Sequence, residues 1–293
     1  MAKVCGTISQ KGVSGSITQK GVRGNIVQKG VAGTIVESGV SGSMYCDEAM
    51  ALFNRLTGEQ PSVALKELIN EVIVYAKEDG WFQLGDCWYM KGVHTAELAC
   101  QNWIKNAHNS TLVNSPTFTE KVGFSGGVGK YINNNYNLYT EADKFTLSES
   151  SIMFMSTLVG ADYTSPLGVY AIPNRTYIIT FPAADRCYMN TDVSNNFLTF
   201  ESGGYYGYVG NGIPLLAYRD GAYVASVNRI LNEVLSDLSM WELQLNYGTT
   251  PMYNWGATGN ICFSWYGGYM TTPQMLALYT RIKYFYDNVG GTF

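Results

Sequence analysis

The sequence predicts a mainly β protein with some α structure, made of a β-structured repetitive N-terminal stalk, a helical neck, and an antiparallel β-sandwich head that ends in a helix. Three observations predict it. A nine-residue unit repeats through residues 6–44, two helical patterns follow within 45–80, and from Trp81 onward short aromatic and β-branched runs are separated by Gly, Asn and Asp. The predicted domains are therefore residues 1–44, 45–80 and 81–293.

The N-terminal repeat reads GTISQKGVS, GSITQKGVR, GNIVQKGVA and GTIVESGVS, followed by GSM. Its glycines follow a three-residue grid that skips one place per repeat, and the segment contains no proline, which excludes collagen. Short β-favouring runs between glycines are typical of an extended β-structured segment. One isoleucine row and one valine row recur with the repeat: Ile8, Ile17, Ile26, Ile35 and Val13, Val22, Val31, Val40.

Two large apolar residues per nine cannot offset the roughly 1–2 kcal/mol of backbone entropy that each ordered residue loses. Several chains around a common axis could bury the two rows and pair the exposed backbone edges. We expect these eight residues to mediate oligomerisation or anchoring, in a homotrimer rather than a dimer. Two alternatives remain: a flexible linker, which strict periodicity disfavours, and an arm that a capsid surface orders.

The helical neck contains two patterns. Residues 47–58 place apolar side chains at helical spacing after Asp47, a plausible cap, and residues 61–80 begin with Pro-Ser and end at Gly80. We predict two helices that connect the stalk to the head.

The head begins at Trp81 and is typical of an antiparallel sandwich. Asp220-Gly221 predicts a two-residue hairpin turn within 215–225, and an apolar stripe predicts a helix over 271–290. The fold of residues 222–245 stays open between a helix and strands.

Composition narrows the function classes. The net charge is −4, and Lys and Arg form no basic run, so we exclude direct nucleic-acid binding. No stretch reaches the roughly 18 apolar residues of a membrane span, and no secretory signal begins the chain. Six scattered cysteines predict buried thiols, with a disulfide framework as the minor alternative.

No motif predicts catalysis, a metal site or a cofactor. The glycine-rich stretch 123–130 lacks the spacing of a phosphate-binding loop and is predicted to be a tight turn. His94 precedes a short helical stretch and is predicted to cap or pack. A polysaccharide depolymerase would need a pair of carboxylates. Four carboxylates lie in loop-like segments, and their spacing does not single out two of them as a catalytic pair: Asp143, Glu149, Asp162 and Asp185. We predict that the protein is not an enzyme.

Exposed aromatic side chains could stack on sugar rings. The candidates are Tyr205, Tyr206, Tyr208 and Trp255, with burial in the core or in a protomer interface as the favoured alternative.

A resemblance extends over about four fifths of the chain. Residues 67–90, 94–140 and 268–291 resemble a domain of structural proteins from Bacteroides-infecting (crAss-like) phages, most specifically in NSPTFTEKVGFSGGVGKYINNNYN (114–137). The resemblance implies a concanavalin-A-like or laminin-G-like head domain and no catalytic residues. With the stalk, it implies a short capsid (head) fibre on the virion surface, made in the host cytoplasm and held by other capsid or fibre proteins. The alternative is a tail fibre that binds a receptor or host-surface glycan.

Overall fold

The computed structural model divides the chain into two units, Met1–Met44 and Tyr45–Phe293. The residues that it describes are 9–11, 27–29, 44–156, 164–171, 174–179, 186–191, 195–196, 204–248, 250–252, 255 and 259–291.

In the first unit, the described residues form two strands, β1 (Ser9–Lys11) and β2 (Val27–Lys29). They pair in parallel, with Ser9 opposite Val27 and Lys11 opposite Lys29. Since these partners are two nine-residue repeats apart, the pairing follows the periodicity of the sequence. The eight predicted oligomerisation residues lie outside the described residues.

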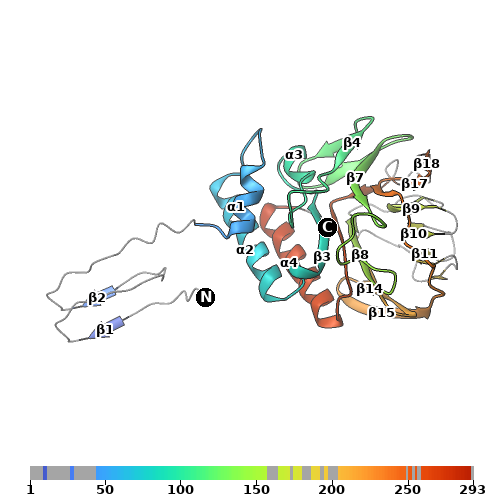
Figure 1. Cartoon of the computed structure of the whole chain (residues 1–293). Helices are drawn as coiled ribbons and strands as arrows, with labels where there is room; N and C mark the ends of the chain where they lie inside the picture. The colour runs from blue at the N-terminus through green and yellow to red at the C-terminus, as the bar shows by residue number, and fades with distance from the viewer. Residues whose placement is uncertain are drawn as a thin grey trace. The chain divides into compact units, whose positions relative to one another are not determined.

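A six-stranded antiparallel sheet forms the centre of the second unit (Figure 1). Its strands are, in spatial order, β15 (Ala222–Asn228), β14 (Pro214–Arg219), β13 (Gly204–Asn211), β8 (Glu149–Ser156), β20 (Phe263–Gly267) and β3 (Gly85–Met90). The turn between β14 and β15 has positive φ angles at Asp220 (50°) and Gly221 (78°), which confirms the predicted hairpin.

A second, larger sheet covers one face of the central sheet. The order of its described strands is β12 (Asn195–Asn196), β11 (Arg186–Met189), β10 (Arg175–Ile179), β9 (Leu167–Tyr170), β16 (Ser239–Glu242), β7 (Tyr131–Asn137) and β4 (Thr111–Val113). At its side, β17 (Leu245–Tyr247) pairs with β9 and with β18 (Thr250–Met252). A small sheet consists of β19 (Asn260–Ile261), β6 (Gly123–Ser125) and β5 (Thr117–Thr119). Residues 222–245, left open by the sequence, contain strands β15 and β16 and, between them, no regular element.

Helices cover the other face of the central sheet (Figure 1). They are α1 (Asp47–Asn54), α2 (Val63–Glu78) and α4 (Thr272–Val289), while the short α3 (Ala96–Ala99) and the 3-10 turn η1 (Phe82–Leu84) flank β3. The predicted C-terminal helix is confirmed, because Met275, Leu278, Ile282 and Phe285 are all buried. Burying these four side chains contributes on the order of 10 kcal/mol before entropy is subtracted.

The predicted helical neck is not a separate element of the fold. Helix α2 packs on α4, where Arg281 Nε lies 2.9 Å from Asp79 Oδ2, and both helices belong to the same compact unit as the sheets. The predicted cap Asp47 is also wrong, since Cys46 occupies the N-cap and Asp47 is the first helical residue. Ser62 caps α2 and accepts a hydrogen bond from the Leu65 amide.

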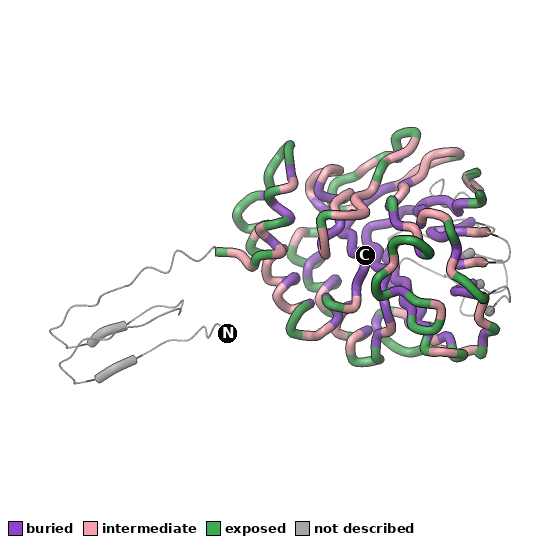
Figure 2. The backbone as a smooth tube through the Cα atoms, viewed as in Figure 1, coloured by how far each residue is buried: buried purple, intermediate pink, exposed green. Residues whose placement is uncertain are grey.

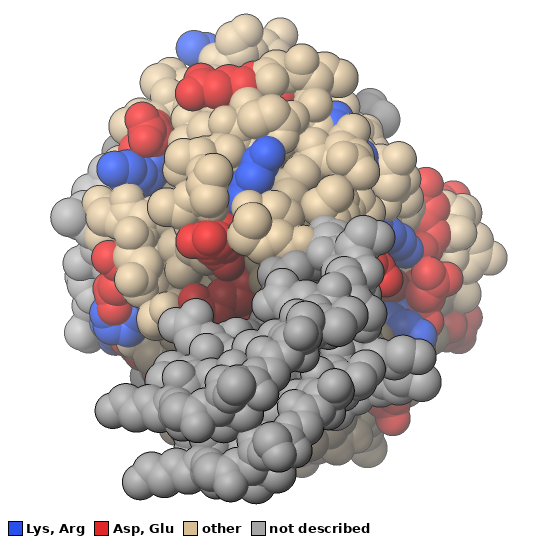
Figure 3. Space-filling model, turned by 90° about the vertical axis from the view of Figure 1, so that its left-hand side faces the viewer, with Lys and Arg blue, Asp and Glu red and all other residues tan. Residues whose placement is uncertain are grey.

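This three-layer arrangement buries both faces of strands β3, β20, β8 and β13, whereas the edge strand β15 has mostly exposed residues. Every residue of β3 and β20 is buried, as are the interiors of β8 and β13 (Figure 2). A sandwich of two sheets would expose alternate residues, so the helical layer is what makes these strands buried throughout. On the described part of the surface seen in Figure 3, charges of both signs are interspersed with broad uncharged areas.

Candidate functional site

The four aromatic residues proposed to contact sugars are core residues. Tyr205 is 0% exposed, Trp255 1%, and Tyr206 and Tyr208 each 4%. Neighbouring strand residues point to opposite faces, and here both faces are covered. The ring of Tyr205 lies 5.6 Å from Tyr279 of α4, while Tyr206 stacks on Phe154 at 5.4 Å. The favoured alternative, burial in the core, is what the structure has, and none of the four offers a face to a ligand.

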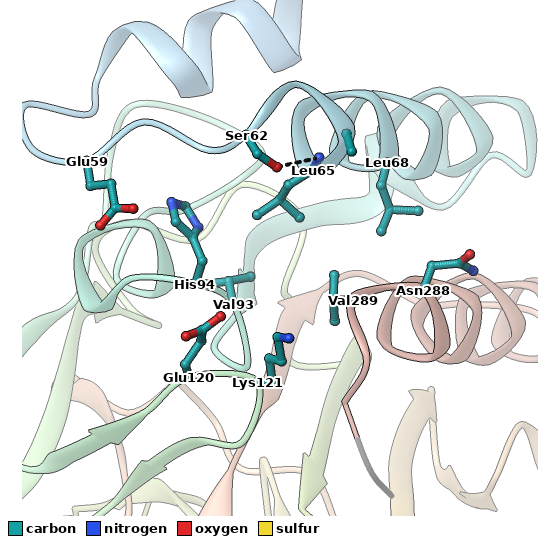
Figure 4. Close-up of a pocket in the computed structure, with 11 residues that line it drawn as sticks. Glu59, Ser62, Leu65, Leu68, Val93, His94, Glu120, Lys121, Asn288 and Val289 are labelled. Atoms are coloured by element: carbon teal, nitrogen blue, oxygen red, sulfur yellow. Dashed lines mark hydrogen bonds between the residues drawn. The ribbon is translucent and has the colours of Figure 1, made fainter.

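A surface cleft of about 380 Å³ opens between the start of α2, the end of α4 and the turn before β6 (Figure 4). Leu65, Leu68 and Val289 belong to its aliphatic lining. Glu59, Glu120 and Lys121 carry its charges at exposed positions. An apolar lining with a charged rim is suited to holding a bound group, and it positions no nucleophile beside a base.

His94 also lines this cleft, and the sequence predicted that it caps or packs. The cap of α3 is instead Thr95, whose hydroxyl accepts from the Leu98 amide at 3.2 Å. Both ring nitrogens of His94 are buried and make no hydrogen bond. Packing is therefore its role in this structure.

A buried polar cluster joins the two large sheets. Its centre is Glu242 of β16, which is 0% exposed and forms an ion pair with the equally buried Lys91 next to the end of β3, at 3.2 Å between Nζ and Oε2. The other carboxylate oxygen, Oε1, accepts from Asn134 Nδ2 at 2.6 Å, from Ser264 Oγ at 2.6 Å and from Tyr266 OH at 2.9 Å.

Ser110 closes the cluster on its other side. Its hydroxyl donates to Asn134 Oδ1 at 2.7 Å and accepts from Lys91 Nζ at 3.4 Å. The ammonium group also lies 4.2 Å from the centroid of the Tyr89 ring. Burial, then the charge of Glu242, raises the pKa of Tyr266 well above its usual value, so this phenol remains a proton donor.

A second buried carboxylate, Asp86 of β3, holds a loop. Its two oxygens accept from the backbone amides of Asp143, Lys144 and Phe145 at 2.9–3.1 Å and from Tyr136 OH at 2.8 Å. The carboxylate is saturated with donors, which indicates a structural role rather than a catalytic one.

Within the part of the chain that the structure describes, the other chemistry predicted from the sequence has no candidate site. Of the four loop carboxylates, Asp143 pairs with Lys105 at 3.1 Å and Glu149 is the exposed first residue of β8, while Asp162 and Asp185 lie outside the described residues. The glycine-rich stretch forms the predicted turn, closed by the Lys130 amide bonding to Gly127 O at 2.9 Å. Among the described residues, no cluster of histidine, cysteine and carboxylate side chains could hold a metal ion, and no helix is long and apolar enough to cross a membrane.

The described cysteines are free thiols, and the prediction that they are buried holds for three of the five, since Cys46 and Cys100 are only partly buried. Cys87, Cys187 and Cys262 are buried, and burial raises the pKa of each. Burial also raises the pKa of the half-buried Cys100 to about 11.

Comparison with known proteins found matches among solved structures but none in sequence. No family model matches the chain, and no curated protein matches its sequence. Among solved structures, the botulinum neurotoxin serotype D binding domain has a TM-score of 0.48 at 12% identity, over 68% of this chain and 52% of that one. The same neurotoxin domain in complex with N-acetylneuraminic acid gives 0.47 at 11%, over 68% and 51%. A Trypanosoma rangeli sialidase mutant with trans-sialidase activity gives 0.48 at 12%, over 74% and 39%.

This chain thus spans about half the length of the neurotoxin domains, and less of the sialidase. The protein is mainly β, with several helices that include a C-terminal one.

Proposed function

We propose that this protein is a structural component of a bacteriophage virion and forms short oligomeric fibres on the capsid surface. In this proposal residues 1–44 assemble the fibre, and the unit from Tyr45 onward is its folded head. Other capsid or fibre proteins of the virion hold it in place, and the protein has no catalytic activity.

The observation that carries the proposal is the pairing of β1 with β2 across two sequence repeats. It supports a β-structured stalk over a flexible linker, because a linker has no reason to pair in register with its own period. Two strands of three residues each are far below what a stable sheet needs in water. Strands from further copies of the chain would supply the missing partners, which is why we favour a homotrimer, with a dimer as the alternative.

Light scattering on the full chain and on residues 45–293 tests this proposal. We expect a trimer for the full chain and its loss in the shorter protein. The variant Ile17→Ser/Ile26→Ser should weaken the trimer, whereas Thr18→Ser, outside the isoleucine and valine rows, should not. Monomers from both proteins would refute the fibre. Antibodies against residues 45–293 that fail to label phage particles would refute the virion role.

A receptor- or glycan-binding tail fibre is the second candidate. The cleft beside α2 and α4 favours it, since a lined hollow of about 380 Å³ is large enough for a small ligand. A glycan array with the full chain is the test, and Leu68→Glu should abolish any binding that uses this cleft. A polysaccharide depolymerase is a weaker alternative, which predicts that the purified protein degrades host polysaccharide.

A further inference from the structure

We propose that Lys91 and Asn134 become joined by an intramolecular amide bond, with Glu242 as the group that transfers protons. The inference concerns the interior of the second unit and does not rest on the proposed virion role.

The first argument is proximity. Lys91 Nζ and Asn134 Nδ2 contact the two oxygens of one carboxylate, at 3.2 and 2.6 Å. On the other side, the hydroxyl of Ser110 contacts Lys91 Nζ at 3.4 Å and Asn134 Oδ1 at 2.7 Å. The amine and the side-chain amide therefore share two bridging partners, which keep them close to each other. Holding reactants in this way replaces a bimolecular encounter by an intramolecular step.

The second argument is the absence of water. Lys91, Asn134 and Glu242 are each 0% exposed, and the ring of Tyr89 covers the amine. In such surroundings a charged pair is costly, and moving one proton from the ammonium to the carboxylate makes both groups neutral. A neutral lysine amine is a nucleophile. Excluding water also protects the acyl group from hydrolysis.

The third argument is that each step has a group in place for it. After Glu242 takes a proton from Lys91, Nζ attacks Cγ of Asn134 and forms the new C–N bond. The developing negative charge on Oδ1 faces the Ser110 hydroxyl, which already donates to that oxygen. Glu242 then passes its proton to Nδ2, to which it is already hydrogen-bonded, and the Cγ–Nδ2 bond breaks. The departing ammonia takes the second proton from Nζ and leaves as an ammonium ion, so that one proton stays on the new amide nitrogen.

The reaction is balanced without a further reagent. The lysine ammonium and the asparagine amide give a lysine–asparagine amide and an ammonium ion, nothing is oxidised or reduced, and Glu242 returns to its carboxylate form. The product links the end of β3 in the central sheet to β7 in the larger sheet. It would tie the two layers covalently, as a disulfide does in other proteins.

Mass spectrometry of the full chain tests the inference. We expect an intact mass about 17 Da below that calculated from the sequence, the mass of one ammonia. Trypsin should not cleave after Lys91, and the digest should contain one branched peptide with both Lys91 and Asn134. The variants Glu242→Gln, Asn134→Ala and Lys91→Met should have their full calculated masses. Lys105→Met, which removes a partly exposed lysine outside this cluster, should keep the deficit.

Two results would overturn the inference. One is the full calculated mass for folded wild-type protein, with Lys91 and Asn134 in separate peptides. The other is a deficit that maps elsewhere, for example to a cyclised imide at Asn211-Gly212. Circular dichroism checks that each variant is folded, and because the wild-type digest decides by itself, a variant that fails to fold does not rescue the idea.

Discussion

Replacing Asp86 by alanine should lower the free energy of unfolding of the second unit by about 4 kcal/mol. The carboxylate is 1% exposed and is the acceptor for three consecutive backbone amides and for Tyr136 OH. Two of these donors, Tyr136 OH and the Phe145 amide, are buried and the other two are partly buried. A buried donor left without an acceptor costs about 1–3 kcal/mol, so about 1 kcal/mol for each of the four gives this figure. For a unit of this size the melting temperature should fall by about 10 °C.

Urea unfolding followed by circular dichroism measures this loss of stability. Two further variants should give smaller losses of known origin. Tyr136→Phe removes one of the four donors and should cost about 1 kcal/mol. Asp143→Asn changes a carboxylate whose side chain is 70% exposed and pairs with Lys105 at the surface, so it should cost less than about 0.5 kcal/mol. A loss below about 1 kcal/mol in Asp86→Ala, or equal losses in Asp86→Ala and Asp143→Asn, would refute the reasoning.

Three further changes should have measurable effects. In Gly168→Ala the new Cβ would lie 2.1 Å from Tyr177 Cβ, and the φ of Gly168, +141°, is one that alanine rarely adopts. The second unit should therefore lose more than about 3 kcal/mol of stability in urea unfolding, and a loss under about 1 kcal/mol would contradict this contact. Arg229→Met removes a buried guanidinium that donates to four backbone carbonyls and should cost about 3 kcal/mol, with part of the loss restored in Arg229→Lys; equal stability of wild type and Arg229→Met would contradict it. Burial raises the pKa of Cys100 from 9.0 to about 11, so its contribution is complete below pH 9 and is lost as the pH rises through 11. Cys100→Ser should therefore show a shallower fall in unfolding free energy between these pH values than the wild type does, and parallel curves would argue against the shift.

Sequence patterns a few residues long correctly predicted the C-terminal helix and the hairpin turn. The stripe of Met275, Leu278, Ile282 and Phe285 specifies a helix with one buried face, and Asp220-Gly221 specifies the hairpin turn, because both patterns depend on residues a few positions apart.

The placement of the helices depends on contacts that sequence spacing does not show. Asp79 and Arg281 come from opposite ends of the second unit, and their pairing makes α2 part of the cover of the central sheet rather than a neck. The same cover explains why successive residues of β13, Tyr205 to Gly210, are all buried instead of alternating between a core face and a solvent face.

The buried cluster was missed because its members are far apart in the sequence. Asn134 and Glu242 are separated by 108 positions, and each residue type is usually found at surfaces. One signal was available: Lys91 directly follows the apolar run Cys87–Met90, and Glu242 lies within MWELQL, so each charge interrupts a buried strand pattern. A charge at such a position needs a partner in the core.

The distribution of aromatic residues gives the two units different optical signatures. Residues 1–44 contain no Trp, Tyr or Phe, while all six tryptophans lie in the second unit, where each is at most 5% exposed. Intrinsic fluorescence therefore does not detect residues 1–44 and reports only the state of the second unit, whereas backbone absorption in the far ultraviolet reports both units. A difference between the two melting curves measures, without any label, whether the first unit loses structure before the second.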